Sequence, residues 1–404
     1  MRYVDGVLME VDENGAPLTK GAPVDQVPLA VVCTPEDMNS AGLPIPGPIR
    51  EAVHLCGTEE YRREFGGNVG PDEIMARLEG LFAYYEVPIG LLEKVLLLQG
   101  HGICIILDDS GSMGQQTDIT VKQAGPYMAT QLAHLHPSTR LTRWQEMQDR
   151  LHILLDFLSC IPCELRIRFL NRTDQIALHK GVDSPEEWAR KAHSAVAMAC
   201  SASPSGQTPL YRVLKGCLEA SRGRQTMFYV FSDGVPSDGA HQVAQLILHR
   251  EAPHHHPITL ISCTDNDEEC QWMKDIEEEA PFTSEVDDYA SEKREVLHDQ
   301  GPVFPYTQGL WLLCMLVGAL CPHDLDAMDD STPFSCFTLG QIMGRVLTEP
   351  EYRRYFRAFP QAKQYQGMYE LLLRERAHAS SLVLAQPASF RQRLFSRFSS
   401  MGPI

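Results

Sequence analysis

The sequence predicts an α/β protein, a doubly wound and mostly parallel sheet flanked by helices, with helical extensions at both ends. Two observations predict this fold class. Strand-like and helix-like runs alternate between about residues 100 and 281, which is typical of parallel strands joined by helical crossovers. Most of the strand-like runs are continuously apolar, as expected for strands that helices cover on both faces.

The predicted strands span residues 103–107, 165–170, 227–231 and 258–263. The second alternates polar and apolar residues as LRIRF, which favours a position nearer an edge of the sheet. After about Pro281 the strand pattern fades, and helical sequence follows.

Helical periodicity fills the gaps between these strands. A helix is predicted between the first two, because six apolar residues fall on one helical face: Trp144, Met147, Leu151, Leu154, Leu155 and Leu158. Further helices are predicted near 186–198, 210–220 and 241–250.

Composition shifts divide the chain into five parts. Residues 1–50 are a loop-rich segment with one strand at 29–33, and 51–99 form a helical extension. The α/β domain covers 100–281, and a second helical extension covers 282–378. Residues 379–404 are a basic, aromatic, amphipathic tail, which can contact a membrane or a partner's groove, or dock on the acidic body of the protein.

Charge and cysteine usage bound the environment and the partners. With 404 residues, of which 44% are apolar, the chain can bury a sizeable core, and its net charge of −18 argues against nucleic-acid binding. The longest apolar run, 309–321, is too short to span a bilayer and predicts a buried helix. Twelve cysteines without the layout of a signal peptide predict a cytoplasmic protein with free thiols. Cys160 and Cys163 form CIPC, but without the strand-to-helix context of a redox pair.

Polar residues gather where the first strand ends, in GICIILDDSGSMG (102–114). Asp108, Ser110 and Ser112 follow that strand, and Asp233 follows another buried strand in FSDG. Thr208, in SGQTPL, lies just before a helix, where it can either cap that helix or face the same crevice. Because open parallel sheets bind ligands beyond the carboxyl ends of their strands, these five residues are predicted to meet there.

Together these residues offer hydroxyl and carboxylate oxygens, which suit a hard divalent cation, Mg²⁺ first, with Mn²⁺ or Ca²⁺ as alternatives. Hydroxyl ligands are neutral, so a metal held mainly by them keeps much of its charge. It can then attract a carboxylate from outside the protein. The donor set therefore predicts a binding device.

The motifs DDSGSM, GQTPL and SDG, in that order and each at a strand or helix end, resemble the metal-ion-dependent adhesion site of von Willebrand factor A domains. The resemblance covers residues 102–263 and implies a Rossmann-like sheet with one short antiparallel edge strand. It implies that Ser110, Ser112 and Thr208 ligate the metal, whereas Asp108 and Asp233 hold coordinating waters. Residues 115–142 depart from the family pattern, in which a helix starts soon after the serine motif.

The resulting hypothesis is a non-enzymatic scaffold or adaptor that binds a partner protein through a divalent cation and an acidic residue of that partner. One alternative is a Mg²⁺-dependent hydrolase or phosphotransferase, but haloacid-dehalogenase-type enzymes need a second aspartate where Ser110 stands. Another is an adaptor subunit for an AAA+ ATPase, since the chain has no P-loop of its own.

Overall fold

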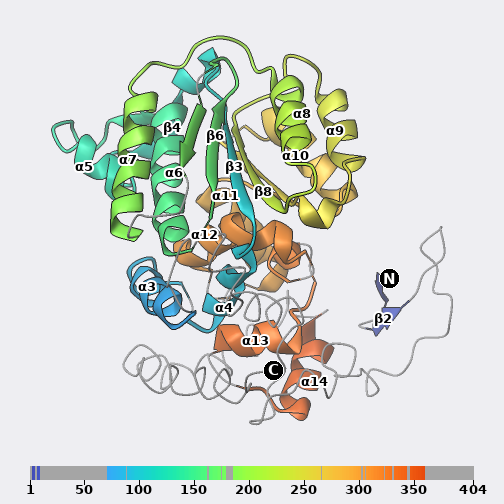
Figure 1. Ribbon diagram of the computed structural model, residues 1–404. Helices are drawn as coiled ribbons and strands as arrows, with labels where there is room; N and C mark the ends of the chain where they lie inside the picture. The colour runs from blue at the N-terminus through green and yellow to red at the C-terminus, as the bar shows by residue number, and fades with distance from the viewer. Residues whose placement is uncertain are drawn as a thin grey trace.

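The structure, a computed structural model, describes residues 2–4, 7–9, 71–87, 89–161, 163–173, 175–178, 185–264, 266–301, 304, 306–322, 324–329, 332–343 and 346–359. Its centre is a six-stranded sheet in the order β10-β9-β8-β3-β6-β7 (Figure 1). The strands are β3 (Gly102–Leu107), β6 (Leu165–Phe169), β7 (Gln175–Leu178), β8 (Thr226–Ser232), β9 (Ile258–Ser262) and β10 (Thr283–Val286). Neighbouring strands pair in parallel except β6 and β7, which are antiparallel.

The four strands predicted from the sequence are confirmed as β3, β6, β8 and β9. The expectation that strands end near Pro281 is wrong, because β10 pairs with β9 beyond that point. Its sequence, TSEV, holds one large apolar residue in four, and an edge strand with a single neighbour needs no continuous apolar run. The short β7 at the opposite edge is also absent from the four predicted strands: its four residues, QIAL, are too few to show a period, and none of them is fully buried.

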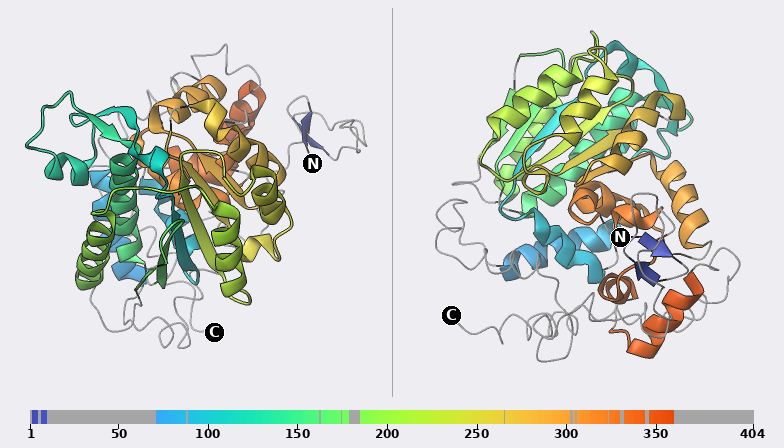
Figure 2. Two further views of the ribbon diagram at one scale, coloured as in Figure 1. Left: turned by 90° about the horizontal axis from the view of Figure 1, so that it is seen from above. Right: turned by 90° about the vertical axis from the view of Figure 1, so that its right-hand side faces the viewer.

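Helices cover both faces of the sheet (Figure 2). On one face of the sheet, Ile103, Ile105 and Leu107 of β3 share a core with two helices, α6 (Arg143–Cys160) and α7 (Pro185–Cys200). On the other face, Cys104 and Ile106 share a core with three helices, α8 (Leu210–Ala220), α9 (Ala240–Leu248) and α10 (Asp267–Glu279). The alternation places successive β3 side chains on opposite faces, as a strand buried on both sides requires.

The apolar face predicted for α6 is confirmed, since all six of its residues are buried. The helix begins with a capping box: the Thr142 hydroxyl accepts a hydrogen bond from the Gln145 amide, and the Gln145 side chain accepts one from the Thr142 amide. This cap fixes the first residue of α6, Arg143, beside the ends of the central strands.

The helical segments before and after the sheet pack together in a layer below it (Figure 1). The Thr307 hydroxyl donates to the Glu86 carbonyl at 3.0 Å, and the Tyr229 hydroxyl of β8 donates to the Leu316 carbonyl at 2.7 Å. The two extensions thus share one core with each other and with one sheet face. They comprise α3 (Pro71–Tyr84), η4 (Ile89–Leu91), α4 (Leu92–Val95), η5 (Leu96–Leu98), α11 (Tyr289–Gln300), α12 (Gln308–Val317), η8 (Gly318–Leu320), η9 (Asp326–Met328), α13 (Cys336–Met343) and α14 (Glu349–Ala358).

Helix α12 is buried from Gly309 to Val317, which confirms a buried helix over most of the apolar run 309–321. Within the described ranges, no helix combines the length and the apolar character needed to cross a membrane. Near the N-terminus, β1 (Arg2–Val4) and β2 (Val7–Met9) pair in antiparallel fashion. The strand predicted at 29–33 and the tail at 379–404 lie outside the described residues.

Candidate metal centre

The five predicted site residues follow elements that end at one edge of the sheet. β3 and β8 are parallel neighbours with Leu107 opposite Phe231, so the residues that follow each strand emerge side by side. The Ser232 hydroxyl crosses between them and donates to Asp108 Oδ2 at 2.7 Å. The predicted meeting of the DDSGSM and SDG motifs is therefore a property of the parallel pairing.

A chain of hydrogen bonds joins four of the five residues. Asp108 Oδ1 accepts from the Ser110 amide at 2.8 Å, and the Ser110 and Ser112 hydroxyl oxygens are 3.0 Å apart. The Ser112 hydroxyl then donates to Asp233 Oδ1 at 2.8 Å. Asp108, Ser110 and Asp233 are buried, whereas Ser112 is half-buried. The two hydroxyls thus lie between two carboxylates, and Ser112 opens the network toward solvent.

Thr208 lies in a loop that is tied to both strand ends. Its carbonyl accepts from the Ser237 amide at 2.9 Å, while the Gly206 carbonyl accepts from the Gly111 amide at 3.2 Å. Gly206 has a φ of +109°, and an added Cβ would lie 2.5 Å from Asn171 Oδ1, so this turn requires glycine. Among the residues described, no hydrogen-bond partner occurs for the Thr208 hydroxyl, which leaves its oxygen available to a ligand.

The alternative reading of Thr208 as a helix cap is wrong. Helix α8 begins at Leu210, and its N-cap residue is Pro209, which makes no side-chain cap. The free amides are capped instead from a neighbouring loop, because the Asp238 carboxylate accepts from the Tyr211 amide at 3.1 Å and from Arg212 at 3.0 Å.

Burial dominates the electrostatics of the two carboxylates. It raises the pKa of Asp108 to about 6, even though the hydrogen bonds from Ser232 and Ser110 favour the ionised form. Burial also raises the pKa of Asp233, against the Ser112 hydroxyl and the guanidinium of Arg143. Two buried carboxylates that are costly to ionise provide a place where a cation is favourable.

Arg143 is a site residue that the sequence reasoning misses. Its Nη1 lies 3.1 Å from Asp233 Oδ2, its Nη2 lies 3.1 Å from Glu269 Oε2, and its side chain is 7% exposed. It therefore occupies the Asp233 oxygen that Ser112 does not use. The capping box at Thr142 is the only sequence signal near it, and that box predicts a helix start without predicting its neighbours.

Asp109 and Asn171 are also missed, and both hold the loops of the site in place. Asp109 Oδ1 accepts from the Asn171 amide at 2.8 Å, and its Oδ2 lies 3.0 Å from Arg172 Nε. The Asn171 side-chain nitrogen donates to the Gln207 carbonyl at 2.7 Å. Asp109 therefore faces away from the serines, and it joins the end of β6 to the loop that carries Thr208.

Residues 115–142 form a small arm with its own core. It holds β4 (Gln116–Thr120), α5 (Pro126–Gln131) and β5 (Arg140–Thr142), with β4 and β5 antiparallel. The Met128 amide donates to Asp149 Oδ1 at 2.9 Å, which fastens the arm to α6. In the view from above, the arm projects sideways from the sheet (Figure 2).

No group of three or more His, Cys, Asp or Glu side chains is placed to hold a metal ion in the described part of the chain. A cation at this edge of the sheet would therefore depend on the hydroxyls of Ser110, Ser112 and Thr208. Cys160 and Cys163 are both buried, and their thiols donate to the Asp156 carbonyl at 3.7 Å and to the Leu158 carbonyl at 3.9 Å.

Comparison with known proteins adds little to this geometry. No family model matches the chain, and no curated protein matches it. Among solved structures, the chain is similar to the PilB minor pilin from Streptococcus sanguinis, with 11% identity and a TM-score of 0.34. The alignment covers 57% of this chain and 62% of the pilin, so it spans less than two thirds of the pilin's length.

Proposed function

We propose that this protein is a von Willebrand factor A type binding module, in which a divalent cation, Mg²⁺ first, links the sheet edge to an acidic residue of a partner protein. The observation that carries the proposal is the hydrogen-bonded chain from Ser110 through Ser112 to Asp233, which gathers neutral and acidic oxygens from two adjacent strand ends. These are the oxygen donors that Mg²⁺, Mn²⁺ and Ca²⁺ prefer.

The five residues would have two roles at the cation. Ser110, Ser112 and Thr208 would supply hydroxyl ligands, and Asp108 and Asp233 would accept hydrogen bonds from coordinated waters. The bound cation would supply a positive charge for the partner's carboxylate. Ser112 is the more exposed of the two serines, so the partner would approach from its side.

A binding role is better supported than a nucleophilic role for Asp108. This side chain is fully buried, and both of its oxygens already accept hydrogen bonds, from the Ser110 amide and from the Ser232 hydroxyl. A nucleophile must instead present a free oxygen to its substrate. We therefore propose a module without catalysis of its own.

Thermal unfolding in EDTA, Mg²⁺, Mn²⁺ or Ca²⁺ tests the proposal. A cation present at 100 times its Kd stabilises the fold by about 2.7 kcal/mol, which raises Tm by several degrees. We expect this rise in the wild type and in Ser138→Ala, a control serine in the exposed part of the arm, and no rise in Ser110→Ala/Ser112→Ala. Equal responses in all three proteins, or no response in the wild type, would refute the metal site. EDTA-sensitive capture of a partner would then test the binding role.

The same titration should depend on pH. Burial raises the pKa of Asp108 to about 6, so the group favours the fold at low pH and this stabilisation is lost as the pH rises through 6. A cation needs the ionised form, which is the minor form at pH 5 and the major form at pH 7. We expect Mg²⁺ affinity to fall about tenfold from pH 7 to pH 5. An affinity unchanged between these two values, measured from the Mg²⁺ dependence of Tm, would exclude Asp108 from the site.

A further inference from the structure

The outward face of β6 carries arginines beside a cavity. Leu165, Ile167 and Phe169 of this strand are buried in the core with α6 and α7, whereas Arg166 and Arg168 lie on the opposite face. A cavity of about 430 Å³ lies there, between β6 and α8. This volume falls within the range of small-ligand sites.

The lining of this cavity is basic, although the protein as a whole is acidic. Arg166, Arg168, Arg172 and Arg212 line it, and among the residues that the structure describes no aspartate or glutamate does. The chain has a net charge of −18, so four arginines with no acidic residue among the described lining are a local reversal of sign. We call this cavity the arginine pocket.

Three of the four guanidiniums have no carboxylate partner among the residues described. Arg172 is committed to Asp109 at 3.0 Å. In contrast, Arg166 donates to the Ser221 hydroxyl at 3.4 Å and Arg168 to Gln175 Oε1 at 2.8 Å, both neutral groups. The Arg168 Nε is buried and has no hydrogen-bond partner. Like charges held close together repel one another, and an anion placed among them would offset that repulsion.

The floor of the arginine pocket responds to the same positive charge. The Cys217 thiol lies there, and its pKa is lowered, first by a hydrogen bond with Cys104 and then by the charges of Arg168 and Arg166. The field of the two arginines therefore reaches into the cavity as well as outward to solvent.

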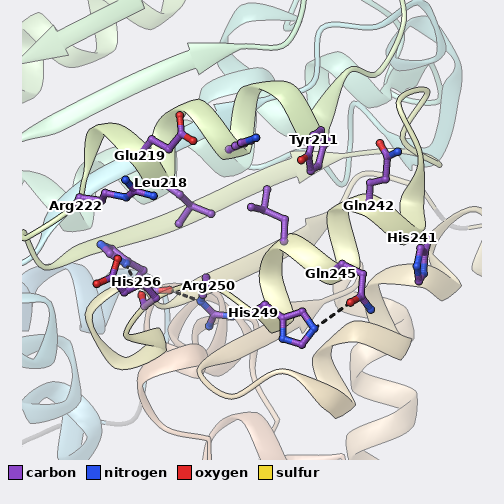
Figure 3. Close-up of a pocket in the computed structure, with 13 residues that line it drawn as sticks. Tyr211, Leu218, Glu219, Arg222, His241, Gln242, Gln245, His249, Arg250 and His256 are labelled. Atoms are coloured by element: carbon purple, nitrogen blue, oxygen red, sulfur yellow. Dashed lines mark hydrogen bonds between the residues drawn. The ribbon is translucent and has the colours of Figure 1, made fainter.

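A second cavity shows what a compensated set of cations looks like. The groove between α8 and α9, of about 670 Å³, is also lined by basic residues, but Glu219 and Glu251 line it too (Figure 3). Its buried arginine, Arg250, donates to backbone carbonyls that include those of His256 and Ile247. The positive charge of Arg250 is thus compensated by carbonyl oxygens within the fold. This groove therefore has less need of an anion than the arginine pocket.

We propose that the arginine pocket binds a phosphate monoester carried by a small molecule. Guanidiniums match phosphate oxygens in geometry and bind them with charge-assisted hydrogen bonds, and the dianion would join Arg166, Arg168 and Arg212. The remaining volume accommodates the rest of such a ligand. The site is independent of the proposed metal centre, because none of the five residues of that centre lines it.

The test measures the Kd of inorganic phosphate and of glycerol phosphate from the shift in Tm, in EDTA and against chloride at matched ionic strength. We expect wild type to respond to both probes and not to glycerol. In Arg166→Gln/Arg168→Gln the Kd should rise at least about tenfold, because each charge-assisted hydrogen bond is worth that much. Arg224→Gln, an exposed arginine outside the pocket, should keep the wild-type Kd.

A variant that fails to fold cannot decide the matter, so Arg212→Gln serves as a second probe. Its side chain is exposed on α8, and its loss should leave Tm in chloride unchanged and still weaken phosphate binding. Equal phosphate responses in the wild type and all variants, or no response in the wild type beyond that to chloride, would overturn the proposal.

Discussion

Replacing Arg143 by glutamine is expected to destabilise the metal-free protein by about 3 to 5 kcal/mol, and yet to tighten Mg²⁺ binding at least about tenfold. The destabilisation follows because Asp233 is fully buried and would lose the cation that lies 3.1 Å from its Oδ2. The gain follows because Arg143 and a bound Mg²⁺ repel each other. At an effective dielectric near 20, the repulsion between a single and a double positive charge within one site is on the order of several kcal/mol.

Two measurements separate these opposite effects. Denaturant unfolding in EDTA gives the loss of stability, and a Mg²⁺ titration of Tm gives the affinity. Arg140→Gln is the matched control, since it removes the same charge from an exposed pair with Asp118 and should change neither quantity. A weaker Mg²⁺ affinity in Arg143→Gln would mean that the guanidinium organises the site for the metal and does not compete with it.

The contact between Arg143 and Asp233 also matters for the metal-free state of the proposed module. With Arg143 on one oxygen of Asp233 and Ser112 on the other, the carboxylate is satisfied without a metal. To act as a ligand, the Ser112 hydroxyl would have to turn away from Asp233, while Arg143 could keep its contact with the other oxygen. The proposed site would then have modest affinity for the free ion and would gain from a partner carboxylate that adds a ligand. Metal and partner would accordingly bind with positive cooperativity.

The central sheet was predictable because local sequence carries its signal. A strand covered on both faces is buried along nearly its whole length, and β3, β8 and β9 are, with apolar side chains at most positions. The edge strands β7 and β10 have one neighbour each and hold only four residues; β10 contains Thr, Ser and Glu, and β7 begins with Gln, so neither shows a long apolar run. The amphipathic face of α6 was predictable for a similar reason, since its period is written within 18 residues.

The candidate site, like the sheet, was predictable only in part. The polar ends of β3 and β8 were predictable because parallel neighbours must emerge at one edge. Arg143, Asn171 and Asp238 were not, because each reaches its partner across 26 or more residues of chain. Asn171 and Asp238 follow strand or loop ends that resemble any other turn in the sequence. Their roles come from the tertiary arrangement of three loops.

The packing of the two helical extensions against each other was not predictable from the sequence either. It depends in part on one glycine. Gly309, in the first turn of α12, packs against the loop after α3: an added Cβ would lie 2.2 Å from the Tyr85 carbonyl oxygen and 2.6 Å from the Val87 amide nitrogen. Both are backbone atoms, so neither can turn away as a side-chain end would. The close approach also sets the hydrogen bond from the Thr307 hydroxyl to the Glu86 carbonyl.

Gly309→Ala should therefore lower the free energy of unfolding by about 3 kcal/mol or more, and Tm by about 6 °C or more. Gly80→Ala is the matched control: it lies in α3, an added Cβ meets nothing within 4 Å, and alanine should stabilise that helix by about 0.5 to 1 kcal/mol. Denaturant unfolding of the two variants and the wild type measures both changes.

If Gly309→Ala unfolds only the extensions, the transition should split in two, while the expected Mg²⁺ response of the sheet persists. A single shifted transition would instead show that the extensions and the sheet unfold as one cooperative unit, as their shared core implies.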